Sequence, residues 1–146
     1  MSALTLAQAA LIVDTALDHA RARGLKPLAV AVLDAGGHLV AFKREDHASI
    51  LRPQIAEGKA WGVLGMGFGG REFARRVQTG PLFLTALMAA SGGRVVPAPG
   101  GVLIRDRDGT IIGAVGISGD TSENDEACAV AGIKAVGLAP DTGEAA

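Results

Sequence analysis

Residues 28–40 read LAVAVLDAGGHLV, and the fold class is best predicted from these residues. Residues 28–33 are continuously apolar, which is typical of a strand that is buried on both faces. The four residues from Asp34 to Gly37 predict a turn, because glycine readily adopts positive φ. Residues 38–43 then predict the return strand, so the chain is expected to contain an antiparallel hairpin.

A second hairpin is predicted in the C-terminal half of the chain. Residues 102–105 and 110–118 read as strands joined by a tight turn, and residues 95–96 as a further short strand. Gly113 and Gly116 lie within the longest of these strands. Glycine inside a strand often marks a bulge or a ligand close to the backbone.

The first helix is predicted where apolar residues begin to recur at helical spacing. Thr5 and Gln8 form a capping box at its start, and Ser49 is expected to cap a later helix that carries Pro53 in its first turn. Gly58 and Gly62 lie four apart in that later helix and predict a close approach of another backbone. Helices are expected over residues 6–23, 50–66, 71–78, 81–90 and from Ser122, whose side chain starts a second capping box with Asp125, to Gly137; residues 139–146 are expected to form a frayed tail.

Two hairpins joined through helices favour the α+β class, with helices packed on an antiparallel sheet. The chain has 146 residues, which is typical of a single domain over residues 1–146. No G-x-G-x-x-G follows the first strand and no P-loop is present, so the sequence does not support a Rossmann pattern.

Charge and composition exclude several classes of partner. The net charge is −1, so no basic field attracts nucleic acid or anionic lipid. The one cysteine, Cys128, allows no intramolecular disulfide and reads as a small buried apolar residue. The first residues lack the pattern of a signal peptide, and no apolar run approaches about 18 residues. We therefore expect a cytoplasmic protein with no nucleic acid and no membrane partner.

His47 is the first candidate for chemistry, because it lies between a strand end and a helix start. Imidazole can bind iron or transfer a proton near neutral pH, although a loop histidine can also be merely solvated. Glu57 can act as an acid, a base or a metal ligand if its helix face points inward. Arg52 and Lys59 can bind carboxylates, or they can belong to a solvated helix face.

The remaining candidates are backbone groups and acids. Gly100 and Gly101 can expose N–H groups to an anionic ligand, or they can simply begin a strand. Asp125 and Glu126 belong to an acidic cluster at a predicted helix start, where the helix dipole stabilises acids. The cluster has more acids than capping requires, so a cation or a partner is the alternative. His19, beside charged residues on the first helix, is expected to be solvated.

Four blocks of sequence together resemble the GlcG/HbpS family of heme-binding or heme-degrading domains, which also occurs as the C-terminal domain of PduO-type proteins. The blocks are residues 28–40, 99–102, 112–121 and the pair Asp125-Glu126, within a match from about residue 5 to 138. The resemblance implies a profilin-like fold, with an antiparallel sheet of about five strands flanked by helices. It also implies a homo-oligomer, from a dimer to an octamer, and heme as the cofactor.

The sequence departs from the family pattern at Asp46-His47-Ala48, where Asp-Gly-Ala is usual. One hypothesis is a heme-binding module with His47 as the iron ligand and with Arg52 or Lys59 at the propionates. A second is an enzyme of small carbonyl or carboxylate metabolites, with His47 and Glu57 as acid and base. In that enzyme Arg52 and the backbone of residues 100–101 hold the oxyanion.

A third hypothesis is a sensory or structural oligomer without a ligand. The first two share one geometric expectation. The His47 ring should face a cavity that is walled by the glycine turn at residues 99–101 and by the start of the last helix.

Overall fold

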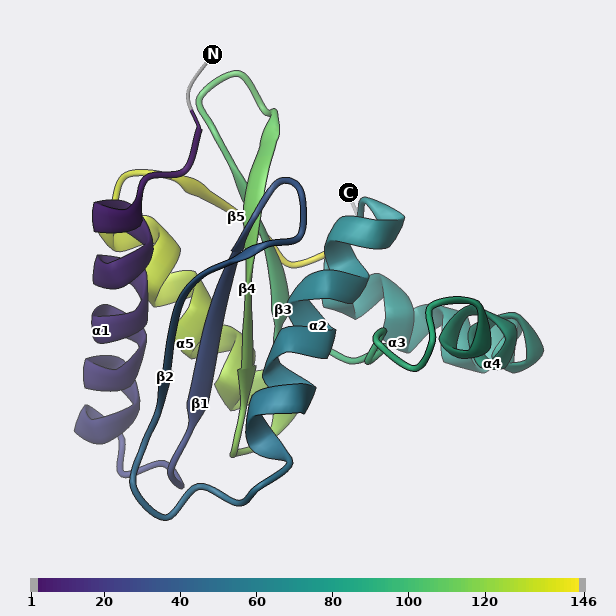
Figure 1. The fold of residues 1–146 in the computed structure, drawn as a ribbon, viewed down its shortest axis with the longest axis horizontal. Helices are drawn as coiled ribbons and strands as arrows, with labels where there is room; N and C mark the ends of the chain where they lie inside the picture. The colour runs from purple at the N-terminus through teal and green to yellow at the C-terminus, as the bar shows by residue number, and fades with distance from the viewer. Residues whose placement is uncertain (1–2, 145–146) are drawn as a thin grey trace.

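The structure is a computed structural model that describes residues 3–144. Its centre is an antiparallel sheet of five strands in the order β2-β1-β4-β3-β5 (Figure 1). The strands are β1 (Ala29–Asp34), β2 (Leu39–Arg44), β3 (Gly101–Arg105), β4 (Ile111–Ser118) and β5 (Ala139–Asp141). The predicted fold class and the predicted sheet are confirmed.

Helices cover both faces of the sheet (Figure 1). On one face lie α1 (Leu6–Ala22) and α5 (Ser122–Ala135), and on the other lies α2 (Arg52–Met66). Two further helices, α3 (Gly70–Thr79) and α4 (Pro81–Ala90), continue from the end of α2 and project away from the sheet. All five helices lie close to the ranges that the sequence predicts.

The two faces of the sheet differ in the size of their side chains. Val115 in β4 lies between Val32 of β1 and Val102 of β3, and this layer packs into the core beneath α1 and α5. The next residue, Gly116, lies between Ala31 and Gly101. These small residues lie under α2, and they leave room for the backbone of that helix to approach the sheet.

Gly116 and Gly101 show how close that approach is. A Cβ on Gly116 would lie far inside van der Waals contact with the carbonyl oxygen of Ala56 and 2.8 Å from the nitrogen of Ala60. A Cβ on Gly101 would lie 2.5 Å from the carbonyl oxygen of Lys59. Gly116 therefore makes room for a helix, where the sequence suggested a bulge or a ligand. Beside Gly113 the pairing of β3 with β4 does shift in register, between Ile104 and Arg105, as expected for a bulge.

Residues 95–96 do not form the predicted strand. They run along α2, where Val96 donates its N–H to the carbonyl of Gly58 at 3.1 Å. A side chain on Gly58 would meet the carbonyl oxygen of Arg94 at 2.7 Å, and one on Gly62 would meet Val95. The predicted close approach of another backbone is therefore confirmed at Gly58, where the partner belongs to the same chain, whereas at Gly62 the neighbours are the side chains of Val95 and Phe73.

The predicted frayed tail is wrong over residues 139–141, which form β5 and pair with β3. Arg105 Nε donates to Asp141 Oδ2 at 2.9 Å, and this contact helps to hold β5 against β3. A strand of three residues with a central proline has too little periodicity to be recognised in the sequence. Residues 145–146, the end of the predicted tail, lie outside the described part of the chain.

Two predicted helix caps are also corrected. The last helix is capped by Thr121, whose hydroxyl accepts from the N–H of Asn124 at 3.2 Å, and not by Ser122. Helix α2 begins at Arg52 without a side-chain cap; Ser49 accepts from the N–H of Arg52 through its carbonyl and from Arg52 Nε through its hydroxyl at 3.3 Å, and caps no backbone N–H with its side chain. Cys128 is buried in the core, as expected. None of the described helices is long and apolar enough to cross a membrane.

Candidate functional site

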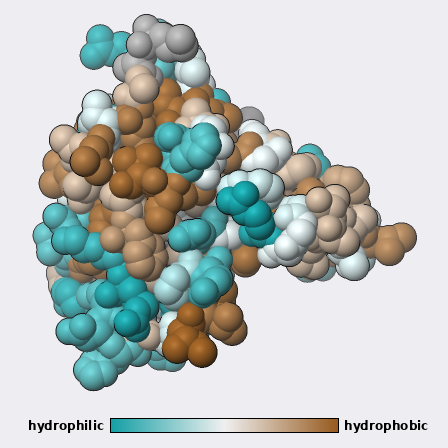
Figure 2. Space-filling view, viewed as in Figure 1, coloured by the Kyte–Doolittle hydropathy of each residue, from teal (hydrophilic) through white to brown (hydrophobic). Residues whose placement is uncertain are grey.

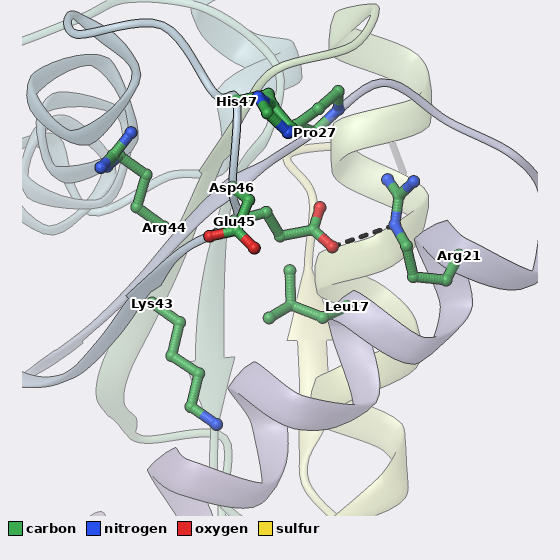
Figure 3. Close-up of a pocket in the computed structure, with 8 residues that line it drawn as sticks. All are labelled: Leu17, Arg21, Pro27, Lys43, Arg44, Glu45, Asp46 and His47. Carbon is green, nitrogen blue, oxygen red and sulfur yellow. Dashed lines mark ion pairs between the residues drawn. The ribbon is translucent and has the colours of Figure 1, made fainter.

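His47 lies in the loop after β2, at a cavity of about 480 Å³ (Figure 3). His47 is exposed, and its backbone has φ 71°. This is the left-handed conformation, which residues other than Gly, Asn, Asp and His rarely adopt. Glycine adopts this conformation without strain, which explains why the family pattern has glycine here. The other residues that line the cavity are Leu17, Arg21, Pro27, Lys43, Arg44, Glu45 and Asp46.

The three cations of the His47 cavity already have partners. Arg21 pairs with Glu45 at 3.0 Å, and Figure 3 shows the Glu45 carboxylate turned toward that guanidinium. Lys43 pairs with Asp14 at 2.7 Å, and Arg44 donates to the carbonyl of Ala48 at 2.9 Å. A ligand carboxylate in this cavity would therefore have to displace an existing contact.

Glu57 faces a different cavity, of about 210 Å³, on the outer side of α2. There Arg94 stacks over the ring of Trp61, with its guanidinium carbon 4.1 Å from the ring centroid. Neither Glu57 nor the glycine turn at residues 99–101 lines the His47 cavity. The cavity expected between His47, the glycine turn and the start of the last helix is therefore not formed within one chain.

Lys59 and Asp125 meet in the interior, although 66 residues separate them. Lys59 Nζ donates to the carbonyl of Ile117 at 2.9 Å and to Asp125 Oδ2 at 3.3 Å. The two side chains are only 6% and 1% exposed. Asp125 Oδ1 also accepts from the N–H of Asp120 at 3.0 Å, so the pair connects α2 with the start of α5 past the end of β4.

The glycine turn covers this pair. A Cβ on Gly100 would lie 2.8 Å from Lys59 Nζ, so the glycine makes room for the ammonium group. Arg52 lies nearby and donates to Ser118 Oγ at 3.0 Å. The structure thus brings four of the predicted site residues together, Arg52, Lys59, Gly100 and Asp125, as an interior polar cluster.

Burial acts on both charges of the pair. Desolvation lowers the pKa of Lys59, and the charge of Asp125 opposes that shift. Desolvation raises the pKa of Asp125, and the charge of Lys59 opposes it. Each group therefore depends on the other to remain charged, and the cluster acts as a structural link between helices.

Glu126, the next residue of α5, points to a third cavity of about 790 Å³. Its carboxylate forms a bidentate ion pair with Arg71: Nη2 donates to Oε1 at 2.6 Å, and Nε donates to Oε2 at 3.0 Å. This cavity is larger than those of His47 and Glu57. Its other lining residues are His19, Arg23, Ala127, Val130, Ala131, Lys134, Pro140, Thr142 and Glu144.

His19 is the imidazole of this third cavity. Its Nδ1 lies 3.1 Å from Arg23 Nη1, one helical turn away. Burial and the charge of Arg23 lower the pKa of His19, which favours the neutral form of the ring. Neutral imidazole is the form that binds a metal.

His19 and Arg71 are site residues that the sequence did not predict. The available signal was spacing: His19 and Arg23 are four apart on α1, and Glu126, Val130 and Lys134 are each four apart on α5. Each row lies along one helix face. That the two rows line one cavity depends on how the helices cross, which spacing within a helix does not reveal.

The family model described as "Haem degrading protein HbpS-like" matches residues 4–134. The chain is 34% identical over 112 residues to the corrinoid adenosyltransferase PduO of Salmonella typhimurium, a match that covers 77% of this chain. It spans about a third of the length of that relative and of the PduO of Citrobacter freundii. A 15.0 kDa protein from the dhaT-dhaS intergenic region of Citrobacter freundii is 33% identical over 99 residues, 68% of each chain.

Solved structures share the whole architecture. The structure of a PduOC:heme complex has a TM-score of 0.85 and 29% identity, covering 98% of this chain and 100% of that one. The protein ORFY of Klebsiella pneumoniae has a TM-score of 0.80 and 28% identity, covering 92% and 91%. HbpS itself, with a TM-score of 0.79 and 24% identity over 93% and 92%, has the same fold. Sequence and fold agree, and the chain belongs to the HbpS-like family.

Proposed function

We propose that this protein binds heme, as a homo-oligomer, in the cavity between α1 and α5. The observation that carries the proposal is the neutral imidazole of His19 in a cavity of about 790 Å³, a volume within the range of roughly 300–1,000 Å³ that small-molecule sites have. The similarity to the heme complex of PduOC supports the same ligand.

His19 is the proposed iron ligand. In the neutral ring one nitrogen carries the proton and the other has the free lone pair. Arg23 donates to Nδ1, which places the ring proton on Nε2. Binding through Nε2 therefore requires the proton to move to Nδ1 and the contact with Arg23 to open, and the guanidinium is then free for a propionate.

The other lining residues fit the remaining parts of heme. Ala127, Val130 and Ala131 present small apolar side chains on one stretch of α5, which suits a flat ring. Arg23 and Lys134 are cations that suit the propionates. Heme would supply redox chemistry at its iron, and the chain would supply the iron ligand His19, the apolar surface of α5 and the cations Arg23 and Lys134.

His47 is the second candidate iron ligand. Its exposed ring lies beside Arg21, Lys43 and Arg44, a set of cations that also suits propionates. The cavity at His47, of about 480 Å³, is smaller than the cavity of about 790 Å³ at His19. We therefore favour His19, and one titration distinguishes the two histidines.

The test is a hemin titration followed by the Soret band. Wild-type protein is expected to bind hemin saturably, and His19→Ala to bind it about tenfold more weakly or worse, a loss of about 1.4 kcal/mol. His47→Ala is the matched control and is expected to bind like the wild type. If only His47→Ala lost hemin affinity, the iron ligand would be His47 and not His19. If the wild-type protein did not bind hemin saturably, the proposal would be refuted.

Helix α4 supports the homo-oligomer. It projects from the body, and apolar atoms gather at the tip of that projection (Figures 1 and 2). Leu82 is 82% exposed and Phe83 is 52% exposed, and in a helix of ten residues only Leu84 is buried. An apolar helix that short is marginal without packing, and a second copy of the chain would supply the packing.

The double substitution Leu82→Ser and Phe83→Ser is expected to lower the mass of the assembly in solution, because it removes the apolar surface that the copies would share. Light scattering on a sizing column measures that mass. Leu6→Ser, at an exposed apolar residue of α1, is the control that should leave the mass unchanged. A monomeric wild type, or an unchanged mass in the double variant, would contradict a contact through α4.

A further inference from the structure

Arg71 holds two carboxylates at the edge of the cavity proposed for heme, and the two differ in burial. Glu126 accepts from Nε and Nη2 of the guanidinium, and its side chain is only 7% exposed. Glu144 makes a single contact, from Oε1 to Nη1 at 3.3 Å, and its side chain is 77% exposed. The inner carboxylate is a fixed partner, whereas the outer one can be exchanged.

The backbone, and not this ion pair, places Glu144 at the cavity. The N–H of Arg71 donates to the carbonyl of Thr142 at 3.0 Å, and the N–H of Gly143 donates to Asp141 Oδ1 at 2.9 Å. Gly69 has no side chain, which allows residues 142–143 to lie against it. The segment after β5 therefore stays in place when the Glu144 carboxylate leaves Arg71, and an exposed ion pair of this kind contributes little stability.

The charges around the cavity point to what replaces Glu144. Three cations line it, Arg23, Arg71 and Lys134, together with the carboxylates of Glu126 and Glu144. With His19 neutral, the lining has a net charge of +1. Once Glu144 has moved away it has a net charge of +2, which matches a ligand with two carboxylates.

We infer that Arg71 anchors a carboxylate of the ligand through Nη1, and that Glu144 occupies this anchor in the free protein as an internal competitor. A planar guanidinium can bind a carboxylate on each of its edges, so Glu126 holds Arg71 in place while the outer edge exchanges. The inference rests on the proposed heme site for the identity of the ligand. It adds that the ligand must carry free carboxylates to displace Glu144.

The test compares hemin with hemin dimethyl ester, which lacks the free carboxylates, on the full chain. Glu144→Gln is expected to tighten hemin binding by up to about fivefold, because the competitor has lost its charge. The ester should bind wild type and Glu144→Gln equally. Arg71→Lys is expected to weaken hemin binding and not ester binding, since lysine keeps the charge without the two-sided geometry.

Glu123→Gln is the matched control. Glu123 is an exposed acid of α5 that does not line the cavity, so its replacement changes the net charge equally without touching Arg71. It should leave hemin affinity unchanged. Equal hemin affinity in wild type and Glu144→Gln, or an equal gain in Glu123→Gln, would overturn the competitor while leaving heme binding intact. Failure of wild type and Glu144→Gln to bind hemin at all would overturn both proposals.

Discussion

Replacing Lys59 with Ala is expected to lower the free energy of unfolding by about 3–5 kcal/mol at neutral pH. The substitution removes the only cation within ion-pair distance of Asp125 among the described residues and leaves a carboxylate that is 1% exposed without a countercharge. It also removes the donor to the carbonyl of Ile117 and opens a space beneath Gly100. Urea unfolding followed by circular dichroism measures the change.

The pH dependence of this variant tests its cause. Without Lys59 the folded pKa of Asp125 lies further above its unfolded value, because burial raises it and only the hydrogen bond from the N–H of Asp120 still opposes the shift. The folded state then binds more protons than the unfolded state, so stability falls as the pH rises through this range. The loss should therefore be smaller in acid than at pH 7.

The double substitution Lys59→Met with Asp125→Leu is the control for packing. It removes both charges and keeps apolar volume, so it should recover much of the stability that Lys59→Ala loses. A loss below about 1 kcal/mol in Lys59→Ala would be typical of an exposed pair and would contradict the interior link.

Replacing Gly116 with Ala is the second change with a large expected effect, a loss of about 3 kcal/mol or more. The new methyl group would meet the backbone of Ala56 and Ala60, and α2 would have to move off the sheet. A flexible side chain could rotate away, but helix backbone cannot. Thermal unfolding and the yield of folded protein measure the effect.

Gly65→Ala is the matched control on α2 itself. Nothing lies within 4 Å of a Cβ at Gly65, and this position is helical and exposed. The same substitution should therefore stabilise the protein by about 0.5–1 kcal/mol, because alanine favours the helix over glycine. Similar losses at both positions would show that the approach of α2 to β4 does not depend on Gly116.

The surroundings of His47 could not be predicted from the sequence. The sequence identified an imidazole at a position where relatives have glycine, and this change suggested chemistry. The structure adds that the backbone there has φ 71° and that the ring is exposed. Whether a loop residue faces a cavity depends on the elements around it, and those are distant in sequence.

The two hairpins, the five helices and the α+β class can be predicted from the sequence alone. Those features depend on apolar periodicity and on glycine turns such as residues 34–37, which act between neighbours along the chain. The sequence did not reveal β5, because an edge strand of three residues exists only through its pairing with β3.

Which charged groups meet depends on how the elements pack in three dimensions. Lys59 contacts Asp125 across 66 positions, and Arg71 contacts Glu126 across 55. Asp125 and Glu126 are adjacent in the sequence, yet Asp125 pairs with Lys59 in the interior and Glu126 pairs with Arg71 at the edge of a cavity. The reason is physical: successive residues of a helix point in different directions, and the crossing of α5 with its neighbours determines what each direction meets.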